Sequence, residues 1–390
     1  MQKLAPAIAL LFLTFNLNAQ TSNTPYTTLS DSIQLQINGY QRILQNLQGI
    51  PAGVTLGGYA EATYNQPTKE DGEMDIQRLV LLFGYKFDER VQFVTEIEYE
   101  HVKEVYVEQA FVNYAVSNGL NIRGGLMLVP MGIINEYHEP TTFNGVERPS
   151  LDNKLVPTTW REMGLGVAGR IDAWSMRYQA YLFNGFLSYD GSKGTLSGSS
   201  GLRGGRQKGA QSTLDHINYS AKFDYYGVPG LRFGLSGYFG KTQAVEEAPE
   251  LGTIIGVSMI GADFRYNHRK WAARGQWIYA NLSDTAVYNQ QTGSDLGSAL
   301  KGYYTEIAYN VLPLANRQRL VTFLRYENFN THHDVAGALL PNPNFHRKEW
   351  TFGWSYHLSQ GTVFKVDYQN KATAGNQKQN QFNVGLGVWF

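Results

Sequence analysis

The sequence of 390 residues contains no cysteine, so disulfide bonds cannot contribute to its fold. It also lacks an apolar run of roughly 20 residues, which a membrane-spanning helix requires. Its 33 basic and 33 acidic residues balance, and nucleic-acid binding domains usually carry a clear excess of positive charge. These absences argue against a helical membrane protein, a disulfide-stabilised scaffold and a nucleic-acid binder.

What the chain has in abundance is glycine and aromatic residues. It contains 41 glycines and 25 tyrosines, and aromatic residues make up 13% of the sequence. Frequent tyrosine, phenylalanine and glycine with modest overall hydropathy are typical of strands that are apolar on one face only.

The first residues have the features of a secretory signal peptide. Lys3 precedes an apolar stretch from Leu4 to Phe15, and the small residue Ala19 follows at a suitable distance for cleavage. The apolar stretch is too short to span a bilayer. We therefore expect a signal peptide at 1–19, with a buried N-terminal helix as the alternative.

From residue 54 onward, apolar and polar residues mostly alternate. In Val91–Glu100, Val91, Phe93, Thr95, Ile97 and Tyr99 lie on one face, and the strand 231–240 repeats the pattern. We predict about 16 strands, near 54–64, 74–87, 91–99, 105–116, 120–128, 161–171, 174–186, 214–225, 231–240, 255–267, 271–280, 302–312, 318–328, 346–358, 362–370 and 381–390.

The connections between these strands alternate in length. Short turns, such as 88–90, 117–119 and 359–361, alternate with connections that are usually longer, including 129–160, 187–213 and 281–301. Up-and-down barrels of the outer membrane have short periplasmic turns and longer extracellular loops. The predicted fold is therefore all-β, a transmembrane antiparallel β-barrel at 51–390. A soluble sandwich or β-helix would not predict this alternation.

The last ten residues form an alternating strand that ends on an aromatic residue. Phe382, Val384, Leu386, Val388 and Phe390 share one face. This strand resembles the C-terminal signal of outer-membrane barrels, so we expect the barrel assembly machinery to recognise the chain through Phe390.

The segment 20–50 has a helical rather than an alternating pattern. Ile33, Ile37, Tyr40, Leu44 and Leu47 form a heptad stripe. We expect a periplasmic helical arm at 20–50. It could form a short coiled coil with its copies, pack against the mouth of the barrel, or act as a linker without a partner.

Several segments resemble the phosphate-selective porin O and P family. The resemblance lies in Asp75-Ile76-Gln77-Arg78, in Glu108–Tyr114, in Val129-Pro130-Met131-Gly132 and in Phe143–Pro149 followed by Gly164–Val167. It extends in architecture over about 54–390, but its motifs concentrate between 75 and 170. It implies a 16-stranded trimeric anion channel with an inward-folded third loop and an arginine-rich lumen.

Charged residues on the predicted inner faces are of both signs. The basic pore-lining candidates are Arg78, Arg123, Arg170, Arg177, Arg232, Arg265, Arg274, Arg325 and Lys365. The acidic ones are Glu96, Glu98, Glu162, Asp263, Glu306, Glu327 and Asp367. A wall of mixed sign produces a weaker net field than a wall of arginines, which departs from the family pattern and argues against a strict phosphate preference.

The connection 129–160 is the candidate for the constriction. It carries prolines at 140, 149 and 157 that stiffen it, together with the charged residues Glu136, His138, Glu139, Glu147, Arg148, Asp152 and Lys154. Folded into the barrel, such a loop narrows the channel and produces a transverse field. An ordinary extracellular loop is the alternative.

Two further segments attract attention. The connection 187–213 is rich in glycine and serine and carries Lys193, Arg203, Arg206 and Lys208, which is typical of a mobile surface loop and could also attract anionic solutes or lipopolysaccharide phosphates. His332-His333-Asp334 could bind a metal ion, but without a further spaced ligand a polar cluster in an exposed loop is the preferred interpretation.

We therefore predict an outer-membrane porin of a Gram-negative cell. It forms a water-filled channel for passive diffusion of small hydrophilic solutes or ions, with anion or phosphate preference as the resemblance implies. An enzymatic barrel or a surface-binding adhesin is the alternative, although no catalytic constellation is recognisable. We expect no cofactor, no metal ion and no nucleic acid. The expected partners are membrane lipid, lipopolysaccharide, the assembly machinery, small solutes and further copies in a homotrimer.

Overall fold

A computed structural model describes residues 38–245 and 251–390 of the chain. The predicted signal peptide at 1–19 lies outside the described residues, and so do Ile33 and Ile37 of the heptad stripe.

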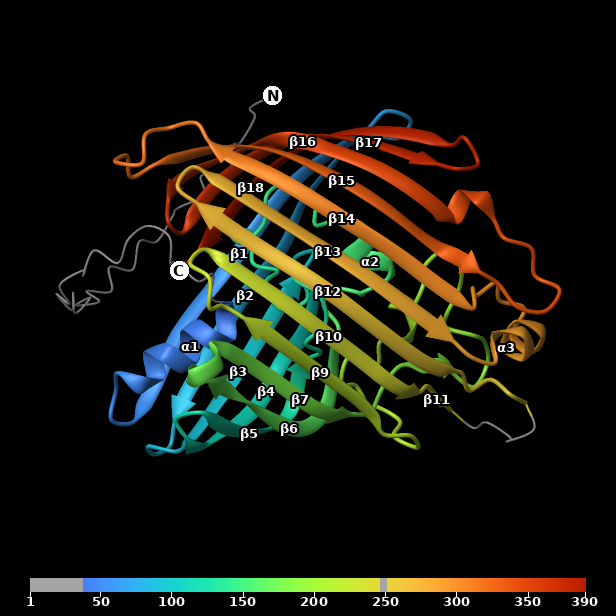
Figure 1. Ribbon diagram of the computed structural model, residues 1–390, viewed down its shortest axis with the longest axis horizontal. Coiled ribbons are helices and arrows are strands. Elements are labelled where there is room, and N and C mark those ends of the chain that lie inside the picture. Colours follow the sequence, from blue (N-terminus) through green and yellow to red (C-terminus); the bar gives the residue numbers. More distant parts are fainter. Residues whose placement is uncertain (1–37, 246–250) are drawn as a thin grey trace, which may run out of the picture.

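Sixteen antiparallel strands form a closed barrel (Figure 1), as the alternating pattern predicts. The barrel closes where the first strand pairs with the last, with Tyr59 opposite Trp389. The strands of the barrel are β1 (Gly53–Pro67), β2 (Glu73–Lys86), β3 (Val91–Glu100), β4 (Glu104–Ser117), β5 (Leu120–Leu128), β6 (Arg161–Ile171), β7 (Met176–Phe183), β9 (Asn218–Tyr225), β10 (Leu231–Lys241), β12 (Gly256–His268), β13 (Trp271–Leu282), β14 (Ala299–Asn310), β15 (Arg319–Asp334), β16 (His346–Ser359), β17 (Thr362–Thr373) and β18 (Lys378–Trp389).

The barrel is apolar outside and polar inside, the reverse of a soluble protein. On β3, Gln92, Glu96 and Glu98 are buried in the interior, whereas Tyr99 is exposed on the outer face. Exposed large apolar side chains recur on strands all around the barrel, among them Leu165, Phe233, Leu235, Phe239, Ile260, Leu324, Phe352 and Leu386. An outer surface of this kind is stable when lipid covers it. Among the described residues, no helix has the length and apolar character needed to cross a membrane.

The two ends of the barrel differ in the length of their connections. At one end the turns are short, for example 118–119 after β4 and 269–270 after β12. The other end, called here the long-loop end, carries 129–160, 184–217 and 283–298. Its hairpins 101–103 and 374–377 are short exceptions.

Helix α1 (Gly39–Gln48) lies in the mouth of the barrel at the short-turn end (Figure 1). Asn38 and Gln41 form a capping box at its N-terminus. Tyr40, Ile43 and Leu47 are buried, and the helix contacts β1, β2 and β3. The described part of the N-terminal arm therefore packs against the mouth of the barrel.

Some strand boundaries differ from the sequence prediction. Strand β7 stops at Phe183 rather than near 186, because Gly185 adopts a positive φ of 82° and Asn184 accepts a hydrogen bond from the Met163 amide at 2.8 Å. Strand β15 continues to Asp334, six residues beyond its expected end. The histidine cluster therefore lies at the end of a strand and not in an exposed loop, and His332 is buried.

The connection after β7 is packed, although we expected a mobile surface loop. Its strand β8 (Leu187–Tyr189) pairs in parallel with β11 (Gln243–Ala244), and it also contains the short 3₁₀ helix η2 (Arg203–Gly205). Leu196 and Leu202 are fully buried, and the Leu196 amide donates to the Tyr288 hydroxyl of α3 (Thr285–Thr292) at 3.0 Å. Apolar residues hidden in a glycine-rich stretch thus fix the loop at the mouth.

Candidate functional site

The connection 129–160 folds into the barrel, and every residue from 129 to 140 is buried. Asn135 holds the two stems of the loop together. Its amide nitrogen donates to the carbonyl oxygens of Val129 at 2.8 Å and Trp160 at 2.9 Å, and its side-chain oxygen accepts from the Trp160 amide at 2.7 Å. One buried side chain thus satisfies backbone groups that would otherwise be desolvated without a partner.

The loop crosses the lumen and reaches the wall opposite its own strands. The Ile133 amide donates to Gln276 on β13 at 2.6 Å, and the Leu151 amide donates to Glu327 on β15 at 3.0 Å. The short helix α2 (Leu151–Lys154) lies at this contact. Because the loop bonds both walls, it divides the lumen into two parts.

Two cavities lie on either side of the loop. The larger, of about 650 Å³, opens at the short-turn end and is lined by α1, Arg123, Arg170, Arg177 and Arg232. The other, of about 420 Å³, lies toward the long-loop end, and its lining includes Arg78, Arg148 and Lys154. We call these the inner and outer vestibules.

The predicted charged residues of the loop lie inside the barrel or at the outer vestibule. Glu136 accepts from the Gln179 amide at 2.7 Å and lies 3.3 Å from the Lys222 ammonium group. Glu139 accepts a hydrogen bond from the Gly39 amide and so binds the N-terminus of α1. Glu147 accepts from Asn65 on β1 at 2.8 Å.

Asp152 of α2 is fully buried and accepts from the Gln276 amide nitrogen at 2.8 Å. Burial raises the pKa of the Asp152 carboxyl to about 8, and the neighbouring Glu327 and Asp263 carboxylates add to this, while the Gln276 bond and Arg325 act in the opposite direction. The group is therefore largely protonated at neutral pH.

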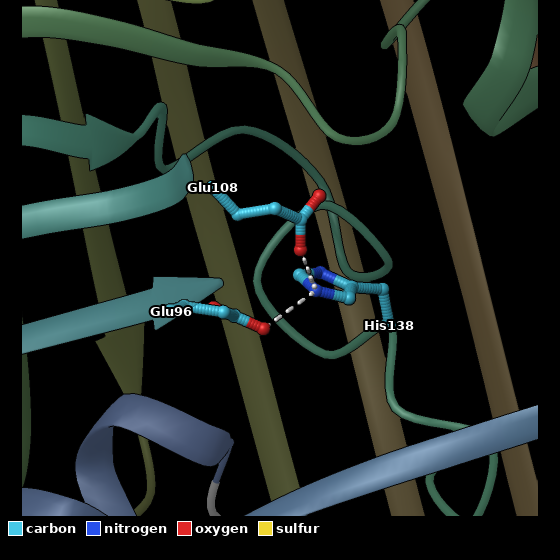
Figure 2. A group of neighbouring side chains, drawn as sticks. All are labelled: Glu96, Glu108 and His138. Atoms are coloured by element: carbon cyan, nitrogen blue, oxygen red, sulfur yellow. Dashed lines mark ion pairs between the residues drawn. The ribbon is translucent and has the colours of Figure 1, made fainter. Parts of the chain in front are cut away.

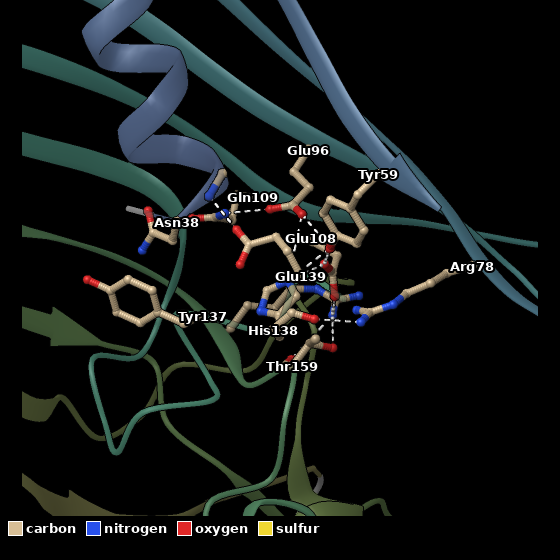
Figure 3. Close-up of polar contacts among 12 residues, drawn as sticks. Asn38, Tyr59, Arg78, Glu96, Glu108, Gln109, Tyr137, His138, Glu139 and Thr159 are labelled. Carbon is tan, nitrogen blue, oxygen red and sulfur yellow. Dashed lines mark hydrogen bonds and ion pairs between the residues drawn. The ribbon is translucent and has the colours of Figure 1, made fainter. Parts of the chain in front are cut away.

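His138 lies between two glutamates of the barrel wall (Figure 2). Its Nε2 atom is 3.3 Å from Glu108 Oε2 and 3.7 Å from Glu96 Oε1. The Tyr59 hydroxyl lies 3.0 Å from the same Nε2 atom and donates to Glu96 at 2.9 Å (Figure 3). Burial alone would lower the pKa of His138, but the carboxylates of Glu108 and Glu96 outweigh it and raise this pKa to about 10.

The wall charges form ion pairs rather than a basic ladder. Arg78 pairs with Glu61 at 3.0 Å, and Arg232 pairs with Asp224 at 2.8 Å. Further pairs at 3.0–3.6 Å join Arg274 and Arg325 to Glu306, and Arg325 to Glu327. Many of the basic and acidic residues that the sequence assigns to the inner wall therefore neutralise one another in local ion pairs.

The remaining predicted wall residues also have definite positions. Arg265 lies over the Tyr137 ring at 4.2 Å and Lys365 lies over the Phe143 ring at 3.8 Å, so both contact the loop. Arg123 and Arg177 line the inner vestibule. Arg170 lies at its rim, where its side chain is 55% exposed and pairs with Asp172.

A group of cations toward the long-loop end, three of which line the outer vestibule, is not neutralised in this way. It comprises Arg148, Lys154, Arg203, Arg206, Lys208 and Arg347, and none of the six has a carboxylate of the described residues within 4.0 Å. Burial and the neighbouring Arg203 and Arg161 lower the pKa of Arg206 to about 9. We call this group the cationic rim.

Sequence reasoning missed several of the interior residues. Strand β4 has a bulge at Glu108, so both Glu108 and Gln109 face inward, whereas strict alternation assigns only one of them to the lumen. Lys222 on β9, which contacts the loop through Glu136 and the Gly132 carbonyl oxygen, was also missed. The period-two pattern of β9, whose buried residues include Lys222 and Asp224, was the available signal.

The fold, the apolar exterior and the internal loop define a transmembrane β-barrel of the outer-membrane porin type. Among solved structures, the chain is similar in fold to an anion-selective porin from Comamonas acidovorans, with a TM-score of 0.57, 13% identity, and coverage of 87% of this chain and 100% of that one. It is equally similar to the outer-membrane channel DcaP of Acinetobacter baumannii, with a TM-score of 0.57 and 11% identity over 87% of this chain and 98% of that chain.

A closer relationship comes from sequence. The chain is 32% identical over 339 residues to an uncharacterized protein of Aquifex aeolicus (strain VF5), which corresponds to 82% of this chain and 76% of that protein. The chain belongs to the family of that protein. No family model matches the chain, so membership of the phosphate-selective porin O and P family stays a prediction.

Proposed function

We propose that the chain is an outer-membrane porin that lets small hydrophilic solutes diffuse passively and prefers anions. The observation that carries this proposal is the loop 129–160, which lies across the lumen between the inner and outer vestibules. A barrel of 16 strands is wide enough for an aqueous channel, and an internal loop narrows it to a selective passage.

The cationic rim supports the preference for anions. Three of its six basic groups, those of Arg148, Lys154 and Arg203, line the vestibule that solutes reach first from the long-loop end, and none of the six has a carboxylate of the described residues within 4.0 Å. Such a surface raises the local concentration of anions before they reach the constriction. The ion-paired wall adds little net field, so selectivity is set at the rim.

Charge reversal at the rim tests this preference. Arg203→Glu combined with Arg206→Glu is expected to shift the zero-current potential, measured in planar bilayers under a salt gradient, toward cation preference. Lys193→Glu is the matched control, because Lys193 belongs to the same connection but is exposed at its tip. An unchanged zero-current potential in the double variant would assign selectivity to other residues.

An enzymatic role finds less support. The buried carboxylates around His138 are closed to solvent, and His138 itself is 1% exposed, so a substrate molecule could not reach them. The channel is therefore the preferred function.

We also propose a homotrimer, which the resemblance implies. A solved structure with the same fold, OmpT of Vibrio cholerae, is described as a trimer form, with 12% identity and a TM-score of 0.53. Light scattering of the detergent-solubilised protein counts the barrels in each particle. Lipopolysaccharide and the assembly machinery, the latter through Phe390, are the further proposed partners.

A further inference from the structure

The strongest unassigned feature is the buried group formed by Tyr59, Glu96, Glu108 and His138. It combines one imidazole, two carboxylates and one phenol, each no more than 4% exposed. The oxygen and nitrogen atoms that could act as ligands in Glu96, Glu108 and His138 all lie within 4.8 Å of one another. Imidazole and carboxylate are ligands that zinc and related divalent transition metals accept together.

The distances suit a tetrahedral site. Metal–ligand bonds of about 2.0–2.1 Å place neighbouring ligand atoms roughly 3.3–3.4 Å apart. His138 Nε2 lies 3.3 Å from Glu108, 3.7 Å from Glu96 and 3.0 Å from the Tyr59 hydroxyl. The same hydroxyl lies 2.9 Å from Glu96 and 3.5 Å from Glu108. Five of the six distances between the four ligand atoms therefore lie within about half an ångström of the tetrahedral value, and the sixth, between Glu96 and Glu108, is at most 4.8 Å.

Each of the three charged ligands is also oriented by a second contact. His138 Nδ1 lies 3.0 Å from the Asn135 carbonyl oxygen, to which it donates, and this leaves Nε2 free to bind a metal. The Gln109 amide donates to the other oxygen of Glu96 at 2.6 Å. Arg161 lies 3.6 Å from Glu108 Oε1, whereas Glu108 Oε2 is the proposed metal ligand. The arginine and the metal ion would therefore bind different oxygens of Glu108.

We propose that Tyr59, Glu96, Glu108 and His138 bind one divalent transition-metal ion, of the zinc class, between the constriction loop and the barrel wall. Three of the ligands come from strands β1, β3 and β4, and the fourth comes from the loop (Figure 3). The ion would fix the loop to the wall at the point where it begins to cross the lumen. This inference concerns metal binding and does not depend on the chain's conducting solutes.

The test is zinc binding by the full folded chain in detergent after chelation and dialysis. We expect one strongly bound Zn²⁺ per barrel by isothermal titration and elemental analysis. His138→Gln and Glu108→Gln should each weaken binding at least tenfold, because each removes a ligand. His268→Gln is the matched control, since His268 is exposed at the end of β12, and it should bind as the parent chain does.

A second measurement keeps the proposal testable if a ligand variant fails to fold. Co²⁺ added to the unmodified chain should give the intense visible absorption of a tetrahedral nitrogen–oxygen site, and Tyr59→Phe should alter that spectrum. Gln109→Ala, which removes only an orienting bond, should weaken binding roughly tenfold. Zinc binding of equal strength in the parent chain, His138→Gln and Glu108→Gln, or an octahedral Co²⁺ spectrum in the parent chain, would overturn the proposal and leave a metal-free ion pair.

Discussion

Asp152 shows how the constriction loop combines stability with a buried titratable group. Its carboxyl lies on α2, bonded to Gln276, among Glu327, Asp263 and Arg325. The folded-state pKa of about 8 lies above the ordinary value of 3.8. The folded barrel therefore retains a proton that the unfolded chain loses. The stability that this proton provides is fully present below about pH 3.8 and is lost as the pH rises through about 8.

Asp152→Asn should remove this pH dependence, because asparagine is neutral and can still accept from Gln276. We expect the free energy of unfolding at pH 9 to rise by up to about 6 kcal/mol, since the pKa rises by about four units and one unit corresponds to about 1.4 kcal/mol. Near pH 3.5 the variant and the parent chain should be equally stable.

Urea unfolding followed by tryptophan fluorescence at the two pH values measures the effect. Asp71→Asn, at an exposed position, is the control and should leave the pH dependence unchanged. Equal pH dependence in Asp152→Asn and the parent chain would show that the pKa of Asp152 is the same in the folded and unfolded chain, and would contradict this account.

At the scale of elements, helix α1 and the constriction loop are physically joined. Glu139 binds the N-terminus of the helix, and the Tyr40 hydroxyl donates to Glu136 at 3.5 Å. Ile43 and Leu47 pack on the inward surface of Gly84. A Cβ atom at Gly84 would lie 2.3 Å from Ile43 and 2.9 Å from Leu47. The helix can therefore pack against β2 only because residue 84 is a glycine.

Gly84→Val should displace α1 from the inner vestibule. We expect a higher single-channel conductance, because the helix occupies part of the mouth, and faster cleavage of the chain around 38–49 by added protease. Gly124→Ala is the control, since a Cβ atom there makes only ordinary contacts at 3.8–3.9 Å. Unchanged conductance together with unchanged protease sensitivity would mean that the helix is held by other contacts.

The elements were largely predictable, because alternation along a strand follows directly from a wall with lipid on one side and polar groups on the other. Sequence could also predict that 129–160 folds inward, by resemblance to a known family. It could not predict the bulge at Glu108, since a bulge depends on how β3 and β4 pair. Nor could it place Tyr59 beside His138, because their contact forms only when the loop enters the barrel.

At the scale of the whole molecule, the barrel has two vestibules with a loop between them. Part of the wall charge is neutralised by ion pairs, and the six cations of the cationic rim have no carboxylate of the described residues within 4.0 Å. If the proposed function holds, the loop sets the resistance of the channel and the cationic rim sets its preference for anions, so the two properties should change independently.

Deletion of 136–154 separates these properties. The deletion removes Asp152 and Leu151, which contact β13 and β15, and it leaves the Ile133 contact with β13 and the stem bond between Val129 and Trp160. It also removes Arg148 and Lys154, but four cations of the rim remain. The barrel should still fold, which the heat-dependent mobility of the protein in gels can verify.

The most direct test of the central claim is the single-channel conductance of this deletion variant in planar bilayers. If the loop 129–160 is the narrowest part of the channel, conductance should increase several-fold over the parent chain, because the narrowest section dominates the resistance. A correctly folded deletion variant with the conductance of the parent chain would contradict the account, since the loop could not then be the constriction.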